Sequence, residues 1–373
     1  MSTHGVHILA FDVPFPADYG GVIEIFNKIK ELHAEGIKIH LHAYQYGRGE
    51  AAELLQYCEK VYYYKRSGIN TLLSIRPYIV ASRDSWELLA NLQINQWPII
   101  FEGLHTCFFL NHKKLTNRKK IVRLHNVEHH YYRQLASRET HIFKKIFYTI
   151  EAYKLKWFEA ILVHANHLLP LSKNDEAYFS ENFNASKITL IDPFLESNKI
   201  SAQIGLGKYI LYHGNLSVNE NEEAANYLIA TLFSKVDFPV VIAGKNPSMA
   251  LQNTTKNYSH IQLVINPSQE SMQQLVADAQ LHVLYTAQPT GIKLKLFNSL
   301  LNGRHCVANS HILAGTTVAT LCEVADDTDT MLGKVRKLLS QPFTEVHIEE
   351  RKLFFSTHYN NNFSVEKILK ILF

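Results

Sequence analysis

KYILYHGNLSVNENEEAANYLIA, at residues 208–230, joins a short apolar run to a segment in which apolar residues recur at helical spacing. The run does not alternate between apolar and polar residues, as a strand with one face in water would. A continuous apolar strand that leads into a helix is typical of a parallel sheet covered by helices on both faces. The stretch therefore predicts one strand and one helix of a doubly wound α/β domain.

The same pattern continues on both sides of this stretch. Later apolar runs are FPVVIAG (238–244), IQLVIN (261–266), AQLHVLY (279–285) and RHCVANS (304–310). Earlier runs are VHILAFD (6–12), IKIHLHAY (37–44), KVYYYK (60–65), WPIIFEG (97–103), KIVRLHN (120–126), AILVHAN (160–166), HLLPLS (167–172) and KITLID (187–192). Helical spacing between them, as in Val22 to Leu32 and Ile142 to Trp157, extends the α/β alternation along the chain.

The length of the chain predicts more than one domain. At 373 residues, it exceeds the size at which a single hydrophobic core usually stops growing. The polar stretch ESNKISAQIGLGK (196–208), shortly after Asp192 and Pro193, has the character of a linker. We expect two tandem Rossmann-like domains facing a cleft, over 1–192 and 193–345, followed by C-terminal helices over 346–373.

Composition limits the classes of partner. The formal net charge is +4, from 38 basic and 34 acidic residues. The chain therefore lacks the concentrated positive charge of a nucleic-acid binder. The start of the chain has no secretory pattern, so we expect a cytoplasmic protein. Basic clusters at 113–114, 118–120 and 144–145 either are solvated or rest on anionic phospholipid at the periphery of the inner membrane.

Two strand ends in the first half carry histidine and glutamate. Glu102 and His105 follow WPIIF, and His125 follows KIVRL. Ligands of open parallel sheets bind outside the carboxyl ends of the strands, so these side chains are candidates for a catalytic site. Gly20 and Gly21 precede a helix and leave its first amide groups open to an anion or a polar substrate, although a tight turn would explain them equally.

Two patterns raise the alternative of a metal site. His125 and His129 have the spacing of ligands on one helix face, but no HExxH order or nearby cysteine accompanies them, and His125 falls on a strand. Asp327 and Asp329 match an Asp-x-Asp pattern, but they directly precede a helical segment, where capping predicts acidic residues. We therefore predict no metal ligands among them.

The second half has its own strand-end candidates. Gly214 and Asn215 follow KYILYH, and Lys245 follows FPVVIAG. In PTGIKLKLFNSLLNG (289–303), we expect a helix that begins near Gly291, with Lys293 and Lys295 in its first turns. Cations at a helix start oppose the helix dipole unless an anion lies nearby, so the two lysines indicate an anion site or are simply solvated.

Taken together, these motifs resemble the retaining glycosyltransferases of the GT-B fold, in particular the bacterial group that builds lipopolysaccharide and capsule. The resemblance covers most of the chain. It depends above all on PFPADYGGVIEIFNKIKELHAEG (14–36), RLHNVEHHYYRQLA (123–136) and GIKLKLFNSLLNGRHCVAN (291–309). It implies a nucleotide-sugar donor bound by the C-terminal domain, a glycan or lipid-linked acceptor bound by the N-terminal domain, no cofactor and no obligatory metal. It also implies a last helix that crosses back to the first domain.

Family roles carry over to matching positions. The glycine-rich first loop of the family maps onto Gly20 and Gly21, and its strand-end histidine near the transferred sugar maps onto His125. Its glycine and basic pair map onto Gly291, Lys293 and Lys295. With His125 on the sugar, we expect Glu102 or His105 to position the acceptor.

The chain departs from the family at the donor site. Members often have glutamates where this sequence has Thr290 and Asn298, and many have basic residues after the glycine that here is Gly214, followed by Asn215. Donor phosphate charge would then fall to Lys293, Lys295 and Lys245. Two alternatives stay open: a nucleotide-sugar epimerase on the same architecture, and a catalytically degenerate relative that binds glycan or a partner.

Overall fold

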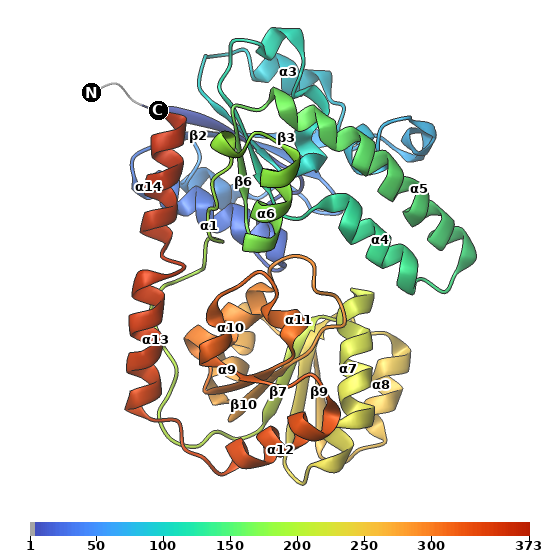
Figure 1. Cartoon of the computed structure of the whole chain (residues 1–373), viewed down its shortest axis with the longest axis vertical. Coiled ribbons are helices and arrows are strands. Elements are labelled where there is room, and N and C mark those ends of the chain that lie inside the picture. Colours follow the sequence, from blue (N-terminus) through green and yellow to red (C-terminus); the bar gives the residue numbers. More distant parts are fainter. Residues whose placement is uncertain (1–3) are drawn as a thin grey trace. The chain divides into compact units, whose positions relative to one another are not determined.

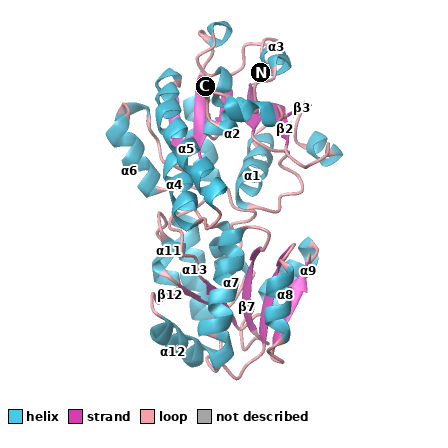
Figure 2. Cartoon of the chain, turned by 90° about the vertical axis from the view of Figure 1, so that its right-hand side faces the viewer, coloured by secondary structure: helices cyan, strands magenta, loops and turns pink. Residues whose placement is uncertain are grey.

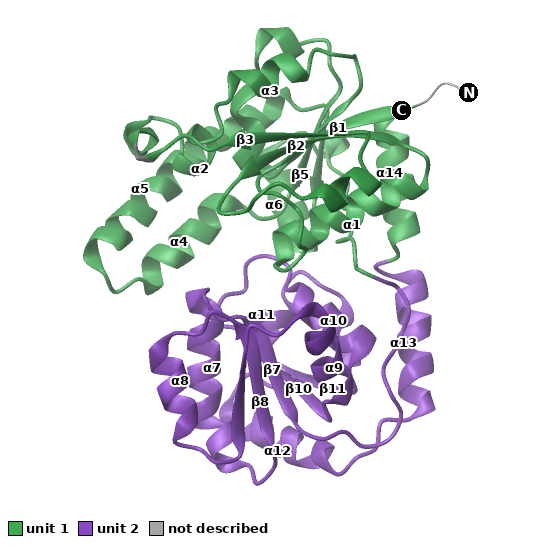
Figure 3. Ribbon diagram, turned by 180° about the vertical axis from the view of Figure 1, so that it is seen from behind, with its two compact units in different colours: residues 1–196, 360–373 green, residues 197–359 purple. Residues whose placement is uncertain are grey.

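The computed structural model describes residues 4–373 and divides them into two compact units (Figure 3). Unit 1 holds the chain up to Glu196 together with Asn360–Phe373, and unit 2 holds Ser197–Tyr359. The C-terminal helices expected after residue 345 are present and divide between the two units. Helix α13 (Glu345–Thr357) belongs to unit 2 and α14 (Asn361–Leu372) to unit 1.

Unit 1 is built on a six-stranded parallel sheet of order β3-β2-β1-β4-β5-β6 (Figure 1). Its strands are β1 (Gly5–Ala10), β2 (Lys38–Gln45), β3 (Lys60–Lys65), β4 (Ile99–Glu102), β5 (Lys120–Leu124) and β6 (His167–Pro170). The strand order reverses between β1 and β4. Ligands of doubly wound sheets bind at the carboxyl ends of strands at such a reversal.

Helices cover both faces of this sheet. They are α1 (Gly20–Ala34), α2 (Tyr78–Ala81), α3 (Trp86–Asn91), α4 (Glu128–Arg138), α5 (Ile142–Phe158) and α6 (Lys173–Asn182). Alternate residues of β1 serve opposite cores: Ile8 packs with apolar residues of α1 and α14, whereas Leu9 packs with residues of α3 and α5. This two-sided burial explains the continuous apolar runs in the sequence.

Two apolar runs of the first half are not strands. AILVHAN lies mostly in a 3-10 helix (Glu159–His164), and KITLID makes only one bridge, between Ile188 and Leu168. The second run donates from Thr189 N and Ile191 N to the carbonyls of Leu168 and Pro170 on β6. Pro170 has no N–H to donate in return, so the ladder does not continue. The Arg123 guanidinium donates to the carbonyls of Ile191, at 2.7 Å, and Asp192, at 3.0 Å.

Unit 2 repeats the architecture with a sheet of order β12-β11-β10-β7-β8-β9, again parallel. The strands are β7 (Ile210–Asn215), β8 (Val240–Lys245), β9 (Ile261–Ile265), β10 (Leu281–Leu284), β11 (His305–Ala308) and β12 (Glu323–Val324). Its helices, with α7 and α8 beside β7 in Figure 2, are α7 (Asn219–Thr231), α8 (Met249–Lys256), α9 (Gln269–Asp278), α10 (Leu294–Asn302), α11 (Ser310–Leu313), α12 (Thr328–Leu339) and α13. The α/β class and both doubly wound sheets expected from the sequence are confirmed.

Side-chain hydrogen bonds explain why the last two helices belong to different units. In α13, Arg351 is buried and donates to the carbonyls of Leu300, at 2.7 Å, and Gly303, at 2.6 Å, in unit 2. In α14, the Asn361 amide bonds the Leu195 carbonyl and, at 2.8 Å, the carboxylate of Glu31 on α1. Within residues 4–373, no helix combines the length and the apolar character needed to span a bilayer.

Candidate functional site

The carboxyl edge of the unit 1 sheet holds a buried cluster of charged side chains. Lys28 on α1 lies 2.9 Å from Glu24 and 2.7 Å from Glu102, and Arg123 lies 2.8 Å from Glu24. His125 Nε2 lies 3.0 Å from Glu102 Oε2. All five side chains are buried. Ion pairs this far from water hold their partners in fixed positions, because losing one charge leaves another uncompensated.

This cluster contains three groups with metal-ligand chemistry. Ligand atoms of Glu24, Glu102 and His125 lie within 4.8 Å of one another. However, the Lys28 ammonium bridges the two carboxylates, which is where a cation would otherwise be needed. Burial would raise the Glu24 pKa, but the charges of Lys28 and Arg123 lower it overall, so the carboxylate stays ionised.

His125 and His129, considered above as a metal alternative and not favoured, do not act as one group. His125 bonds Glu102, whereas His129 Nδ1 lies 3.2 Å from the carboxylate of Glu159. The strand end therefore orients His125 through Glu102. Glu102 is fully buried and already bonded to Lys28 and His125. These contacts make it a residue that positions His125. Its predicted contact with an acceptor stays a prediction.

His105 lies near a group that the sequence analysis did not select. Its Nδ1 is 3.9 Å from Oε1 of Glu128, the first residue of α4, and neither atom has a hydrogen-bond partner among residues 4–373. Burial raises the pKa of Glu128 to about 8 and lowers that of His105 well below its usual value. The position of Glu128 just after a strand end could have marked it as a candidate site residue in the sequence. Its burial is visible only in the fold.

Gly20 and Gly21, the two predicted glycines of the first loop, differ in whether packing requires glycine. A Cβ on Gly21 would come within 2.6 Å of the Phe11 ring, so packing requires glycine there. A Cβ on Gly20 would meet nothing within 4 Å. Phe11 in turn lies between two predicted site residues, with ring centroids 5.1 Å from His105 and 5.3 Å from His125. Gly21 thus allows the close approach that packs Phe11 beside both histidines.

At the carboxyl edge of the unit 2 sheet, both predicted lysines point to the start of α7. Lys293 Nζ lies 2.9 Å from Glu220 Oε1 and 3.0 Å from the carbonyl of Thr290. Lys295 Nζ donates to Asn221 Oδ1 at 2.9 Å. Burial lowers the pKa of Lys295 to about 8, against the opposing effect of Glu220. The anion that accompanies Lys293 in this structure is therefore a carboxylate of the chain itself.

The helix that carries the lysines begins later than predicted. Helix α10 starts at Leu294, with Lys293 as its N-cap, so Gly291 lies in the preceding loop rather than at the helix start. Gly291 has a φ of 72°, a left-handed conformation that glycine adopts without strain. This turn ends the loop that brings Lys293 back toward α7.

The remaining donor-site candidates lie at or near the same edge. Asn215 pairs in register with Lys245 across β7 and β8, but its side chain accepts from Ser217 N at 3.1 Å and so is committed to the turn after Gly214. Asn298 lies on α10 and accepts from Asn302 at 2.7 Å. His213, also at the end of β7, is buried, neither of its ring nitrogens bonds another residue of the described chain, and burial lowers its pKa to about 3. Sequence reasoning did not select it.

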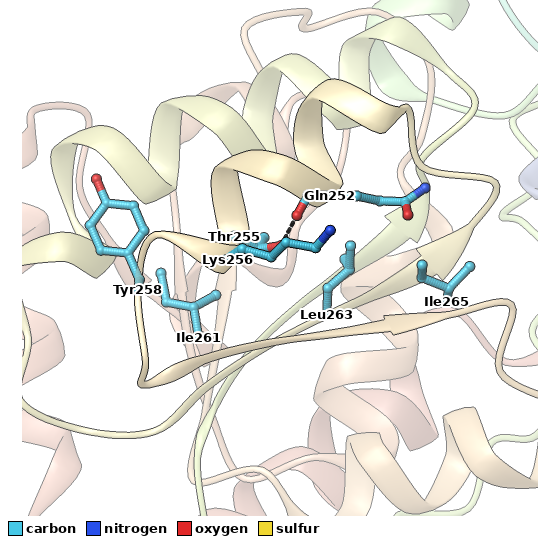
Figure 4. Close-up of a pocket in the computed structure, with 7 residues that line it drawn as sticks. All are labelled: Gln252, Thr255, Lys256, Tyr258, Ile261, Leu263 and Ile265. Carbon is cyan, nitrogen blue, oxygen red and sulfur yellow. Dashed lines mark hydrogen bonds between the residues drawn. The ribbon is translucent and has the colours of Figure 1, made fainter.

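Two shallow pockets lie away from these residues. One, of about 270 Å³, lies between α8 and the edge strand β9 (Figure 4). Its lining is Gln252, Thr255, Lys256, Tyr258, Ile261, Leu263 and Ile265. The other, of similar volume, is lined by residues within 33–39 and 55–59 of unit 1. Neither contains a predicted site residue.

Comparison with known proteins places the fold. No family model matches the chain. An uncharacterised 44.6 kDa protein of the cps region of Klebsiella pneumoniae is 26% identical over 331 residues, covering 83% of this chain and 84% of the relative. Among solved structures, TarM aligns with a TM-score of 0.71 at 10% identity, covering 100% of this chain and 99% of TarM.

Two further solved structures align with the chain over nearly its whole length. A glycosyltransferase of Rickettsia africae aligns with a TM-score of 0.65 at 12% identity, covering 100% of this chain and 98% of its own. Anabaena HepE, solved with UDP and glucose, aligns with a TM-score of 0.65 at 10% identity, covering 99% of each chain. The chain therefore has the GT-B fold of two Rossmann-like units that these glycosyltransferase structures share.

Proposed function

We propose that this protein is a glycosyltransferase that moves a hexose-type sugar from a nucleoside diphosphate donor to a glycan or lipid-linked acceptor. The observation that carries the proposal is the convergence of Lys293 and Lys295 on the start of α7 at the switch point of the unit 2 sheet. Helix starts at this position, with cations beside them, suit a diphosphate. The proposed chemistry uses no cofactor and no metal.

The leaving group explains the need for both lysines. Departure of a nucleoside diphosphate develops negative charge, which preorganised cations stabilise most effectively where water is excluded. Lys295 is held by Asn221 above the Tyr212 ring, 4.9 Å from its centroid. Lys293 must release Glu220 before it binds phosphate. The donor thus exchanges one anionic partner of Lys293 for another.

Unit 1 supplies the groups for the sugar and the acceptor. His125, oriented by Glu102, would hold the transferred sugar as it passes through an oxocarbenium-like state. The unbonded atoms of His105 and Glu128 would receive the acceptor hydroxyl. With a pKa near 8, Glu128 exchanges a proton readily near neutral pH. Retention of configuration follows only from the family resemblance.

Relatives support the substrate class. HepE was solved with UDP and glucose, which makes UDP-glucose a first donor to test. The Klebsiella relative lies in a cps region, which supports a role in polysaccharide synthesis.

Binding of nucleotides tests the donor site. UDP, GDP and ADP are screened by thermal unfolding, where a ligand at 100 times its Kd adds about 2.7 kcal/mol of stability. We expect Lys293→Ala or Lys295→Ala to weaken binding at least about tenfold, because a hydrogen bond to a charged group contributes about 1.5–3 kcal/mol. Lys256→Ala, an exposed lysine of the same unit, is the control. Unchanged binding in both site variants would refute the phosphate role.

Incubation with the matching nucleotide sugar then separates the activities. A transferase leaves the donor nearly intact until an acceptor is added. Conversion of the sugar without acceptor would identify an epimerase. Tight nucleotide-sugar binding with no turnover on any acceptor fraction from the native host would identify a degenerate relative, as the replacement of two family glutamates by Thr290 and Asn298 would allow.

A further inference from the structure

An exposed apolar stripe runs the length of α5. Phe143, Ile146, Ile150, Tyr153 and Trp157 are all exposed, and their spacing of three and four residues places them on one face of the helix. Phe143 is 74% exposed and Trp157 68% exposed. The opposite face of α5 is buried through Ala152, Leu155 and Phe158. Packing inside unit 1 therefore does not explain the stripe.

A neighbouring loop extends the apolar surface. The 3-10 helix η2 (Ile69–Leu73) is joined to α5 by Lys154, whose Nζ lies 3.4 Å from the carbonyl of Leu72. Leu73 is 94% exposed and Ile75 78% exposed. The helix hairpin of α4 and α5 extends away from the sheet of unit 1 (Figure 1). Contiguous exposed apolar area of this kind marks an interaction surface.

The charges around the stripe select the partner. Helix α5 carries four lysines, of which Lys154 pairs with the buried Glu151 at 3.0 Å and Lys156 pairs with Glu159 at 3.3 Å. The other two, Lys144 and Lys145, are exposed beside Phe143 and Ile146. Two copies of this helix packed stripe to stripe would bring lysine close to lysine, without the opposite charges that pair coiled coils. Aromatic residues with flanking lysines suit the interface of an anionic bilayer, where rings enter the headgroup region and amines reach the phosphates.

The three basic clusters of the sequence differ in burial and in their distance from the stripe. In the cluster 118–120, Arg118 and Lys120 are buried and bond backbone carbonyls, so a lipid contact through those two residues is excluded. Lys113 and Lys114 are exposed but lie outside the stripe. Of the three clusters, the one at Lys144 and Lys145 lies on α5, next to the exposed Phe143 and Ile146.

We propose that the exposed stripe of α5, with η2, docks unit 1 onto a membrane surface rich in anionic phospholipid. Binding would combine partial insertion of the Phe143, Trp157 and Leu73 side chains with attraction of the flanking lysines. This surface is independent of the donor site, so its test does not depend on glycosyl transfer.

Cosedimentation of the full chain with vesicles tests the proposal. We expect binding to vesicles of equimolar phosphatidylglycerol and phosphatidylcholine, weaker binding in high salt, and little binding to phosphatidylcholine alone. Lys144→Gln with Lys145→Gln should weaken binding about thirtyfold, since each lysine near an anionic surface contributes about a fivefold factor. The matched pair Lys113→Gln with Lys114→Gln should change it less than about twofold.

The apolar part is tested separately. Phe143→Ala with Trp157→Ala should abolish sedimentation with vesicles, whereas Trp86→Ala, which removes an equally exposed tryptophan from α3, should leave it unchanged. Analytical ultracentrifugation without lipid provides the counter-test. Two results would overturn the proposal. One is a dimer that dissociates when Phe143 and Trp157 are replaced. The other is vesicle binding that neither the lysine variant nor the Phe143 and Trp157 variant weakens.

Discussion

The Nζ atom of Lys293 lies 2.9 Å from Oε1 of Glu220, and the hydroxyl of Thr286 bonds the same carboxylate. An acidic residue at the start of α7 is thus the anionic partner of Lys293, in the position that we propose for a donor phosphate. Glu220 lies in the first turn of α7, the helix after β7, and Lys293 lies at the end of the loop after β10. The two segments meet because β7 and β10 are neighbours in the sheet.

Replacing Glu220 tests whether this carboxylate competes with the donor. Glu220→Gln should strengthen UDP binding by up to about fivefold, because a partly exposed ion pair contributes about 0.2–1 kcal/mol that the ligand no longer has to overcome. Glu222→Gln, two residues further along α7, is the control. Isothermal titration calorimetry gives both values, and weaker UDP binding in the Glu220 variant would instead assign Glu220 a direct contact with the ligand.

Donor affinity should depend on pH through Lys295. Its pKa of about 8 means that the amine loses its proton above that pH, and a neutral amine does not attract a diphosphate. We expect UDP affinity to be constant from pH 7 to about 8 and then to fall, approaching about tenfold per pH unit. Lys295→Arg keeps its charge and should remove the dependence. Phosphate titration does not interfere, since its second pKa is about 6.

The buried cluster of unit 1 should be sensitive to the loss of one charge. Lys28→Met leaves Glu102 and Glu24 without their shared ammonium, and breaking a buried ion pair costs about 3–5 kcal/mol. The free energy of unfolding in urea measures this. Lys30→Met, on the same helix but partly exposed, should change it by less than about 0.5 kcal/mol. Near-equal losses in the two variants would show that the cluster is not a stabilising unit.

Acid should destabilise unit 1 through paired histidines in its core. His7 Nδ1 lies 2.8 Å from His42 Nε2, and burial lowers the pKa of His7 to about 3 and that of His42 well below its usual value. In the unfolded chain these histidines bind protons near pH 6.5, whereas in the folded chain they stay neutral at that pH. Stability should therefore be full above pH 6.5 and fall between pH 6.5 and 3, by up to about 1.4 kcal/mol per pH unit for each histidine. His7→Gln should reduce this slope, and an unchanged slope would count against the assignment.

Much of the fold could be predicted because its signals are local. A strand buried on both faces needs a continuous apolar run, and a helix on a sheet needs apolar residues every three or four positions. Both requirements were readable in β7 with α7 and in α1. They failed at KITLID, which donates to the carbonyls of Leu168 and Pro170 but receives no bond from Pro170, because proline has no N–H. No pattern inside KITLID reports which residue of a neighbouring strand lies opposite it.

Composition and periodicity by themselves determined two doubly wound α/β units and the strand ends where polar residues would gather. The tertiary structure alone decided which of those residues meet: Lys293 with Glu220, Lys28 with Glu102, and His105 with Glu128. It also decided which basic residues are buried, as at Arg118, and which stay on the surface, as at Lys144. The reason is that each pairing joins residues at or after the ends of neighbouring strands, and strand order depends on crossovers whose ends are far apart in the chain.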